Sequence, residues 1–375
     1  MPDFYKIIYS CKKSHWKRPR IIESMLQDLL YGQTFRILPS HEEIVNLTTE
    51  SFGNHLSDLG ESEGRQWFSI KLPRIQLDFA GFAGIMSQLW GNILDYGEFR
   101  LEFIDNQWIT NHLQSWNSSR RFPCIPIRKT PFLATVIKPS YHLTLKERMR
   151  LCIEFVKLGG DFIKEDETYF PSFERMVQEV AAIQESLDSL EAGTRGLGIY
   201  VPNVSGVVHR DDWIEELCLK GLKAAMVNFL MVGFQTVQRV ASGAAANVFL
   251  WGHRVGFKSM QNTFGIFPMI QLSMAAGLNA VHIGTPILND MEQVAKAKKI
   301  AKDLNDLKTK MSIPFLPIFT KTTKSIISGM IEIFEDQCIL VGCGEFNTGK
   351  NGNWDSKKII AWVNAARGTM GTEEK

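Results

Sequence analysis

A lysine stands among four carboxylates in the stretch from Gly159 to Glu167, which reads GGDFIKEDE. Side chains alternate along a strand, so Lys164 and Asp166 share one face while Glu165 points the other way. Glu167 lies where such a strand should give way to a loop, and it can turn back to the first face. Two carboxylates with a third oxygen donor suit Mg²⁺, whereas a protonated lysine cannot ligate this ion. From the residues alone, Lys164 is either an ion-pair partner of the acids or a neutral lysine that takes part in chemistry.

Polar residues capable of acid–base chemistry or anion binding also end other apolar runs of the chain. Lys138 ends the run that begins at Phe132, and His253 and Arg254 end another. The remaining polar run ends are Asn203, Asn228, His282 and Thr320. One such end is ordinary, but a consistent series is difficult to explain by structure alone. We therefore expect these side chains to share a site.

Short runs rich in β-branched and aromatic residues alternate with amphipathic stretches from about residue 132 onward. The eight runs are 132–138, 162–167, 198–203, 224–229, 248–253, 280–284, 314–319 and 338–344. Thr144 with Glu147 fits a capping box at the start of the first following helix. The alternation predicts an α/β fold, a (β/α)₈ TIM barrel of residues 129–375, preceded by an N-terminal α+β domain of residues 1–128. Because catalytic residues of such barrels lie at the carboxyl ends of the strands, the polar run ends would form one active site.

The composition excludes several classes of function. The chain has 375 residues, 45% of them hydrophobic, and a net charge of +2, so it can bury a large core and lacks the basic footprint of a nucleic-acid binder. No apolar run reaches the roughly 18 residues that a membrane span needs, and the polar N-terminus lacks the apolar segment of a signal peptide. Six cysteines without a CxxC pair favour a reducing compartment. We expect a cytoplasmic protein without nucleic-acid or membrane partners.

The motifs, taken in order along the chain, resemble those of the large subunit of RuBisCO and the RuBisCO-like proteins. The resemblance rests on GGDFIKEDE, on TVIKP at 135–139, on His253 with Arg254, and on HIGT at 282–285. In that family the lysine matching Lys164 is carbamylated by CO₂ and holds Mg²⁺ together with the carboxylates matching Asp166 and Glu167. The resemblance thus implies Mg²⁺ with CO₂ bound as a lysine carbamate.

The resemblance also implies roles for the residues around this metal. Lys138 matches the base that takes a proton from the carbon next to a metal-bound carbonyl, and burial and nearby Mg²⁺ would favour its neutral form. Asn92 matches an asparagine that reaches the active site of the partner subunit, which implies a homodimer. We place both with His253 among the catalytic residues. The implied substrate-binding residues, which contact hydroxyls or a phosphate, are Arg254, His282, Thr320 and Gly344.

Departures from the family argue against carboxylation of ribulose bisphosphate. The loop that begins at Gly284 contains no lysine before Lys296, although carboxylases of the family need one there. Ser140 replaces the second lysine of the strand-one motif. Thr322 replaces a glycine at one of the two phosphate sites, whereas the Arg254 site is largely kept. We therefore expect a substrate that carries a single phosphate.

The function that follows is Mg²⁺-dependent enolisation, of the tautomerase or isomerase type, of a phosphorylated sugar derivative. An alternative enzyme is a decarboxylase or transcarboxylase that acts on an oxidised sugar phosphate, because loss of CO₂ can form the same enediolate. The alternative from another class is a non-catalytic dimeric binding protein. Mg²⁺ binding that strengthens with bicarbonate would favour the enzymes.

Overall fold

The computed structural model of this chain folds into two compact units. It describes residues 4–17, 25, 56–73, 81–91, 99–117, 125–126, 130–191, 196–210, 212–242, 247–286, 288, 290–311, 315–335, 337–342, 344, 346 and 354–368. Unit 1 contains Met1–Ser115 and Gly256–Ala276, and unit 2 contains Trp116–Val255 and Gly277–Lys375. The predicted boundary between residues 128 and 129 lies outside the described residues and stays a prediction.

Unit 1 is built on a four-stranded antiparallel sheet with the order β2-β3-β1-β4. Its strands are β1 (Phe4–Lys12), β2 (Leu56–Ser62), β3 (Arg65–Pro73) and β4 (Phe99–Phe103), and its helices are α1 (Lys13–Trp16), α5 (Gly81–Met86), the π-helix η2 (Ser87–Gly91), α6 (Asn106–Asn117), α12 (Phe257–Met260) and α13 (Ile266–Ala275). Strand β1 buries alternate residues, because a period of two places Tyr5, Ile7 and Tyr9 on one face. Gln271 of α13 accepts a hydrogen bond of 2.9 Å from the backbone N–H of Ile104 and donates one to its carbonyl. The predicted N-terminal α+β domain is confirmed.

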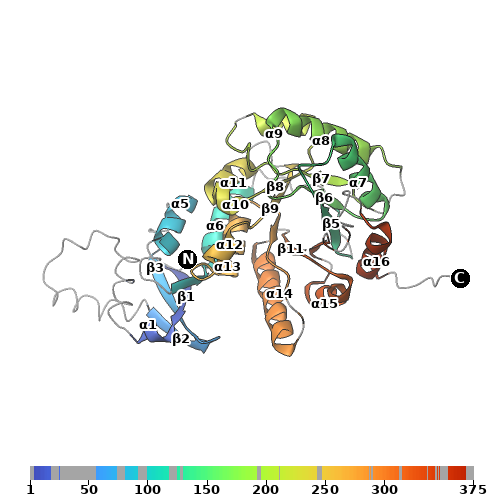
Figure 1. Cartoon of the computed structure of the whole chain (residues 1–375). Coiled ribbons are helices and arrows are strands. Elements are labelled where there is room, and N and C mark those ends of the chain that lie inside the picture. The colour runs from blue at the N-terminus through green and yellow to red at the C-terminus, as the bar shows by residue number, and fades with distance from the viewer. Residues whose placement is uncertain are drawn as a thin grey trace. The chain divides into compact units, whose positions relative to one another are not determined.

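Unit 2 is a parallel barrel (Figure 1). Its strands are β5 (Phe132–Val136), β6 (Phe162–Lys164), β7 (Ile199–Val201), β8 (Ala224–Val227), β9 (Phe249–Gly252), β10 (Ala280–His282), β11 (Leu316–Thr320) and β12 (Ile339–Val341), in the order β7-β6-β5-β12-β11-β10-β9-β8. A parallel bridge between Asn203 and Met226 joins the chain after β7 to β8, so the two ends of the sheet meet. Seven of the eight predicted runs contain one of these strands, and the run 314–319 covers β11 except for its last residue, Thr320, which confirms the TIM barrel.

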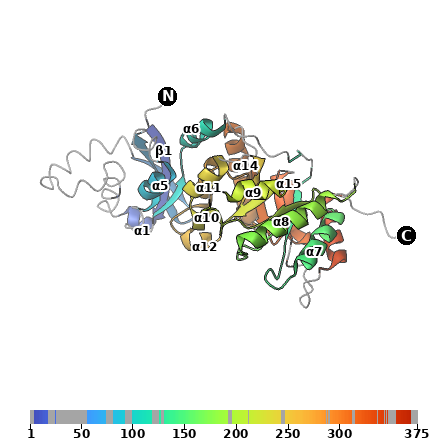
Figure 2. The same ribbon diagram turned by 90° about the horizontal axis from the view of Figure 1, so that it is seen from above.

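Alternate residues of the barrel strands fill its interior. Phe132, Phe162 and Trp251 belong to one buried apolar cluster whose members come from all eight strands. The opposite faces of the strands pack against the helices α7 (Leu145–Lys157), α8 (Phe173–Asp188), α9 (Trp213–Leu219), α10 (Phe229–Val232), α11 (Phe234–Ser242), α14 (Met291–Met311), α15 (Lys324–Phe334) and α16 (Ser356–Arg367). Helices α7 and α8 lie side by side in both views (Figure 1, Figure 2). The predicted capping box of Thr144 and Glu147 is present at the start of α7.

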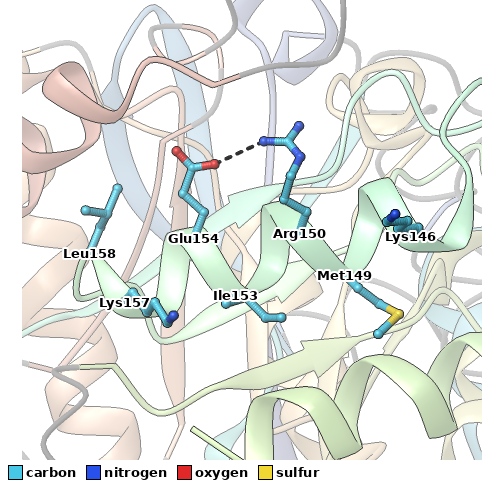
Figure 3. Close-up of a pocket in the computed structure, with 7 residues that line it drawn as sticks. All are labelled: Lys146, Met149, Arg150, Ile153, Glu154, Lys157 and Leu158. Carbon is cyan, nitrogen blue, oxygen red and sulfur yellow. Dashed lines mark hydrogen bonds and ion pairs between the residues drawn. The ribbon is translucent and has the colours of Figure 1, made fainter.

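Helix α7 presents two different faces. Its outward face carries a hollow of about 570 Å³, lined by Lys146, Met149, Arg150, Ile153, Glu154, Lys157 and Leu158 (Figure 3). Its buried face carries Leu151, Cys152 and Phe155, and also a fully buried arginine, Arg148. The hollow therefore lies on the helix surface and holds none of the predicted site residues.

Among the described residues, no helix is long and apolar enough to span a bilayer.

Candidate active site

The ends of β5 and β6 bring a lysine and a carboxylate into contact. Val136 of β5 pairs with Lys164 of β6, so the residues that follow these two positions also lie side by side. The ammonium Nζ of Lys138 is 2.7 Å from Oδ2 of Asp166. Oδ1 of Asp166 accepts hydrogen bonds from the Thr168 hydroxyl at 2.6 Å and backbone N–H at 2.9 Å. Burial alone would raise the pKa of Asp166, but the bonds from Lys138 and Thr168 lower it to about 2.

Lys164 is buried inside the barrel, with 1% of its surface exposed. Its Nζ donates to the Glu165 carbonyl at 2.8 Å, lies 3.5 Å from the sulfur of Met226, and is 3.7 Å from Oε2 of Glu167. Burial lowers the pKa of Lys164, although Glu167 and Asp166 oppose this shift. The neutral amine of Lys164 is thus easier to form than that of an exposed lysine.

Glu167 connects the lysine to a pair of histidines. Its Oε2 lies 3.7 Å from Nζ of Lys164 and 3.7 Å from Nε2 of His253. The rings of His253 and His282 meet edge to face with their centroids 4.6 Å apart. Burial and the Lys164 ammonium lower the pKa of His253 to about 3, so this imidazole is neutral near pH 7. Its Nδ1 is buried and has no hydrogen-bond partner among the described residues.

One ring nitrogen of His282, Nε2, is hydrogen-bonded within the protein. The indole Nε1 of Trp251 donates a 2.7 Å hydrogen bond to Nε2 of His282. Burial lowers the pKa of His282 well below its usual value, in agreement with Nε2 acting as an acceptor. A substrate can therefore reach this ring only through its other nitrogen.

Glu165 points away from the barrel interior, as strand alternation predicts. Its carboxylate accepts hydrogen bonds from the guanidinium of Arg148 and, at 2.8 Å, from the hydroxyl of Tyr200. Its neighbours Lys164 and Asp166 face the other side. Glu165 therefore lies behind the site rather than in it.

Two asparagines hold the loop after β6 from the neighbouring strands. The side-chain amide of Asn203 donates to the Glu167 carbonyl at 3.1 Å, and that of Asn228 donates to the same carbonyl at 3.0 Å. Ser205 connects the two, because its hydroxyl donates to Oδ1 of Asn203 and accepts from the backbone N–H of Asn228. Both amides thus fix the backbone of a carboxylate-bearing loop.

The predicted substrate-binding residues lie at or just after the ends of four consecutive strands, β9 to β12. The guanidinium of Arg254 packs so closely on Gly284 that a Cβ at the glycine would be 2.4 Å from Nη2. The Thr285 hydroxyl donates to the carbonyl of Thr320, which joins the end of β10 to the end of β11. Gly344 lies in an exposed turn after β12, where a Cβ would meet nothing within 4 Å. Asn92 lies outside the described residues, and its predicted role stays a prediction.

The side chains of Lys164, Asp166 and Glu167 fit Mg²⁺ only if the amine of Lys164 is converted to an oxygen donor. Asp166, Glu167 and Lys164 gather at the end of β6, but the described residues contain no group of three ordinary His, Cys, Asp or Glu ligands. Addition of CO₂ to the neutral Lys164 amine, with release of one proton, would form a carbamate whose anionic oxygen supplies the missing third ligand. The residues therefore fit a carbamate-assisted magnesium site.

Sequence reasoning missed the charged residues behind the site. Arg148 and Glu179 are both buried, and the pair lies 3.6 Å apart. A signal was present, because Arg148 shares the period of Leu151, Cys152 and Phe155 and so falls on the apolar stripe of its helix.

The eight parallel strands and the helices between them define the chain as a TIM-barrel protein. The family model for the ribulose bisphosphate carboxylase large chain, catalytic domain, matches residues 122–312, about half of the chain. The chain therefore belongs to the RuBisCO large-chain family.

Individual relatives are distant. The ribulose bisphosphate carboxylase of Methanocaldococcus jannaschii is 23% identical over 266 residues, which cover 66% of this chain and 61% of that protein. The octameric RuBisCO of Pyrococcus horikoshii OT3 aligns with a TM-score of 0.76 at 16% identity, over 99% of this chain and 89% of that one. A RuBisCO-like protein from Rhodopseudomonas palustris aligns with a TM-score of 0.73 at 14% identity, over 100% of both chains. The fold of this chain is thus similar both to that of a carboxylase and to that of a RuBisCO-like protein.

Proposed function

We propose that this chain is a RuBisCO-like enzyme that uses Mg²⁺ and a carbamylated Lys164 to enolise a phosphorylated sugar derivative. The observation that carries the proposal is the convergence of Lys138, Lys164, Asp166, Glu167 and His253 at the ends of three barrel strands. Lys138 faces Asp166, and Lys164 faces Glu167. Removing such charges from water costs free energy, so a function is expected to explain why the fold keeps them together. Family membership supplies that reason.

In this proposal Lys164, Asp166 and Glu167 would hold the ion. Bound there, Mg²⁺ would polarise a substrate carbonyl and so acidify the neighbouring C–H bond. Lys138 is the base that accepts that proton. Its side chain is 45% exposed and paired with Asp166, so it is not buried as the sequence reasoning supposed. Engagement of Asp166 by a cation would weaken the pair and favour the neutral amine.

The other side chains bind the substrate. Neutral His253 can exchange a hydrogen bond with a substrate hydroxyl, because its buried Nδ1 has no partner in the part of the chain that the structure describes. Arg254, with its planar fork of donors, suits a phosphate, and the backbone of Gly284 and Thr285 lies beside it. One phosphate site of this kind fits a monophosphate.

Carboxylation of ribulose bisphosphate is not part of the proposal. The first lysine after β10 is Lys296, inside α14, where it pairs with Glu292 at 3.0 Å. Ser140, which replaces the second lysine of the strand-one motif, is buried, and its hydroxyl donates to the Ile137 carbonyl at 2.8 Å. The segment between β10 and α14 contains no lysine, and residue 140 is a serine, so neither offers an ammonium to orient CO₂.

A homodimer belongs to the proposal through Asn92, by its match to a residue that reaches the partner's site. The octameric state given for the Pyrococcus horikoshii RuBisCO supports self-association of this fold. Sedimentation of the full chain would test the dimer.

Metal binding tests the proposal most directly. Titration of the full chain with Mg²⁺, with and without bicarbonate, should show tighter binding with bicarbonate, and Lys164→Ala should remove the difference. Lys308→Ala is the matched control, because burial also lowers the pKa of Lys308, to about 8, but this lysine lies on α14 near Gln337. Magnesium binding that is indifferent to both bicarbonate and Lys164 would contradict the proposal.

Substrate chemistry separates the remaining alternatives. Incorporation of solvent deuterium into ketose monophosphates reports proton abstraction, whereas release of CO₂ from oxidised sugar phosphates reports a decarboxylase. A chain that binds such compounds and does neither would be the non-catalytic binding protein.

A further inference from the structure

A buried arginine links the two loops that carry the candidate catalytic groups. Arg148 lies on the inward face of α7, opposite the outward residues drawn in Figure 3, and none of its surface is exposed. One arm of its guanidinium, Nη1, donates to the carboxylate of Glu165, and the other, Nη2, donates to the carbonyl of Ser140. Ser140 belongs to the loop after β5, two residues from Lys138, and Glu165 belongs to the loop after β6, between Lys164 and Asp166.

Further contacts fix the guanidinium in place. Its plane lies over the ring of Tyr169, with Cζ 4.2 Å from the ring centroid, and its Nε is 3.6 Å from Oε1 of Glu179. The Tyr169 hydroxyl donates to the same oxygen of Glu179 at 2.7 Å. Burial alone would lower the pKa of Arg148, but Glu165 raises it, so the group stays charged. The orientation of the guanidinium is therefore fixed, with Nη1 directed at Glu165 and Nη2 directed at Ser140.

Stability does not require such an arrangement. A buried ion pair is often no more stable than an apolar side chain of similar volume, because desolvation offsets the attraction. What a rigid two-armed donor provides is geometry, since it joins a defined carboxylate to a defined carbonyl. We propose that Arg148 is a positioning residue that clamps the loop after β5 to the loop after β6 and thereby sets the distance between Lys138 and Asp166.

The consequence concerns the proposed metal site, and calling the clamped groups catalytic rests on the proposed function. Glu165 is covalently flanked by Lys164 and Asp166, so holding its side chain outward directs both neighbours inward. Release of Glu165 would let this short segment rotate. Release of Ser140 would let Lys138 move away from Asp166, whose oxygen it meets at 2.7 Å.

The molecule contains a matched control at the opposite end of the same two strands. Arg367 of α16 contacts the carbonyl of Pro131 at 3.3 Å, just before β5, and the carboxylate of Asp161 at 2.8 Å, just before β6. It joins the same strands by the same type of bond, far along the strands from Lys138. Arg148→Met and Arg367→Met should therefore both loosen the barrel, but only the first should disturb the site.

The experiment compares wild type, Arg148→Met, Arg148→Lys and Arg367→Met in crystal structures and in Mg²⁺ titrations with bicarbonate. We expect Arg148→Met to separate Lys138 from Asp166 beyond 4 Å and to weaken Mg²⁺ binding at least tenfold. Arg148→Lys should not rescue either readout, because a single ammonium lacks the two diverging arms. Arg367→Met should leave the pair intact and Mg²⁺ binding within about twofold.

The outcomes separate this inference from the proposed function. An unchanged Lys138–Asp166 contact in Arg148→Met, or equal effects of Arg148→Met and Arg367→Met, would overturn the positioning role. Wild type that ignores bicarbonate would overturn the proposed function alone, because the crystal structures still decide the clamp. If Arg148→Met does not fold, Arg148→Met/Glu165→Gln removes both buried charges and is compared in the same way.

Discussion

Lys138 and Asp166 meet across two neighbouring barrel strands, with 2.7 Å between the ammonium and the carboxylate. The proposed base and one proposed metal ligand are therefore direct neighbours. Whatever binds the carboxylate also acts on the lysine, and a positively charged ligand of Asp166 would favour the neutral Lys138 amine, the form that can accept a proton. Under the proposed function, this contact would link metal binding to proton transfer.

Replacement of Lys138 should remove proton abstraction without unfolding the chain. Lys138→Met is expected to lower solvent-deuterium exchange into a responsive sugar phosphate about 10²- to 10⁴-fold, the usual contribution of a general base. The melting temperature should change little, because the side chain is 45% exposed. Proton NMR measures the exchange, and Lys146→Met, an exposed lysine of α7, is the control. Exchange at the wild-type rate in Lys138→Met would assign the base elsewhere.

Replacement of Lys164 should cost function but not stability. Lys164 is 1% exposed, and Met226 is already one of its contacts, so a methionine fits the surroundings. Because burial lowers the pKa of Lys164 against the pull of Glu167 and Asp166, its charge costs stability, and Lys164→Met is expected to leave the free energy of unfolding unchanged or higher. The same variant should lose the bicarbonate effect on Mg²⁺ binding. Urea unfolding followed by circular dichroism checks the first expectation, and a marked loss of stability would show that Lys164 is a structural ion-pair partner.

Acid should destabilise the fold through His253. Its pKa is about 3 in the folded chain against an ordinary 6.5, because of burial and Lys164, with Glu167, Asp166 and Arg254 also acting on it. The unfolded state therefore binds the proton first as the pH falls. The stabilising contribution is complete above pH 6.5 and declines down to about pH 3, with a slope of at most about 1.4 kcal/mol per pH unit. His253→Gln should flatten the dependence of unfolding free energy on pH in this window, and an unchanged slope would contradict the assignment.

A methyl group at Gly284 should disturb the proposed phosphate site. Gly284 has φ of +89° and would bring a Cβ within 2.4 Å of the Arg254 guanidinium. Gly284→Ala should lower stability by roughly 1–3 kcal/mol through backbone strain and displace the arginine, so inorganic phosphate should bind at least tenfold more weakly. Gly368→Ala is the control, since Gly368 also has a positive φ, of +67°, but a Cβ there meets nothing within 4 Å. Calorimetric titration with phosphate compares the two, and equal binding would remove Arg254 from the site.

The sequence by itself determined the barrel and predicted that its polar run ends lie at the rim. Short runs rich in β-branched and aromatic residues identify the barrel strands because these strands are buried on both faces, and a polar residue that ends such a run lies at the barrel rim. The alternation of side chains along a strand placed Lys164 and Asp166 on one side and Glu165 on the other. These conclusions depend on neighbours in the chain, which a sequence displays.

Only the tertiary structure decided which partners these side chains have. The indole of Trp251 takes Nε2 of His282, and Arg148 joins Ser140 to Glu165, although the partners lie on different elements of the chain. Lys138, expected to be buried, is half exposed and held by Asp166. Such contacts depend on how helices and strands pack, because hydrogen-bond direction and burial are properties of three-dimensional neighbours that periodicity does not contain.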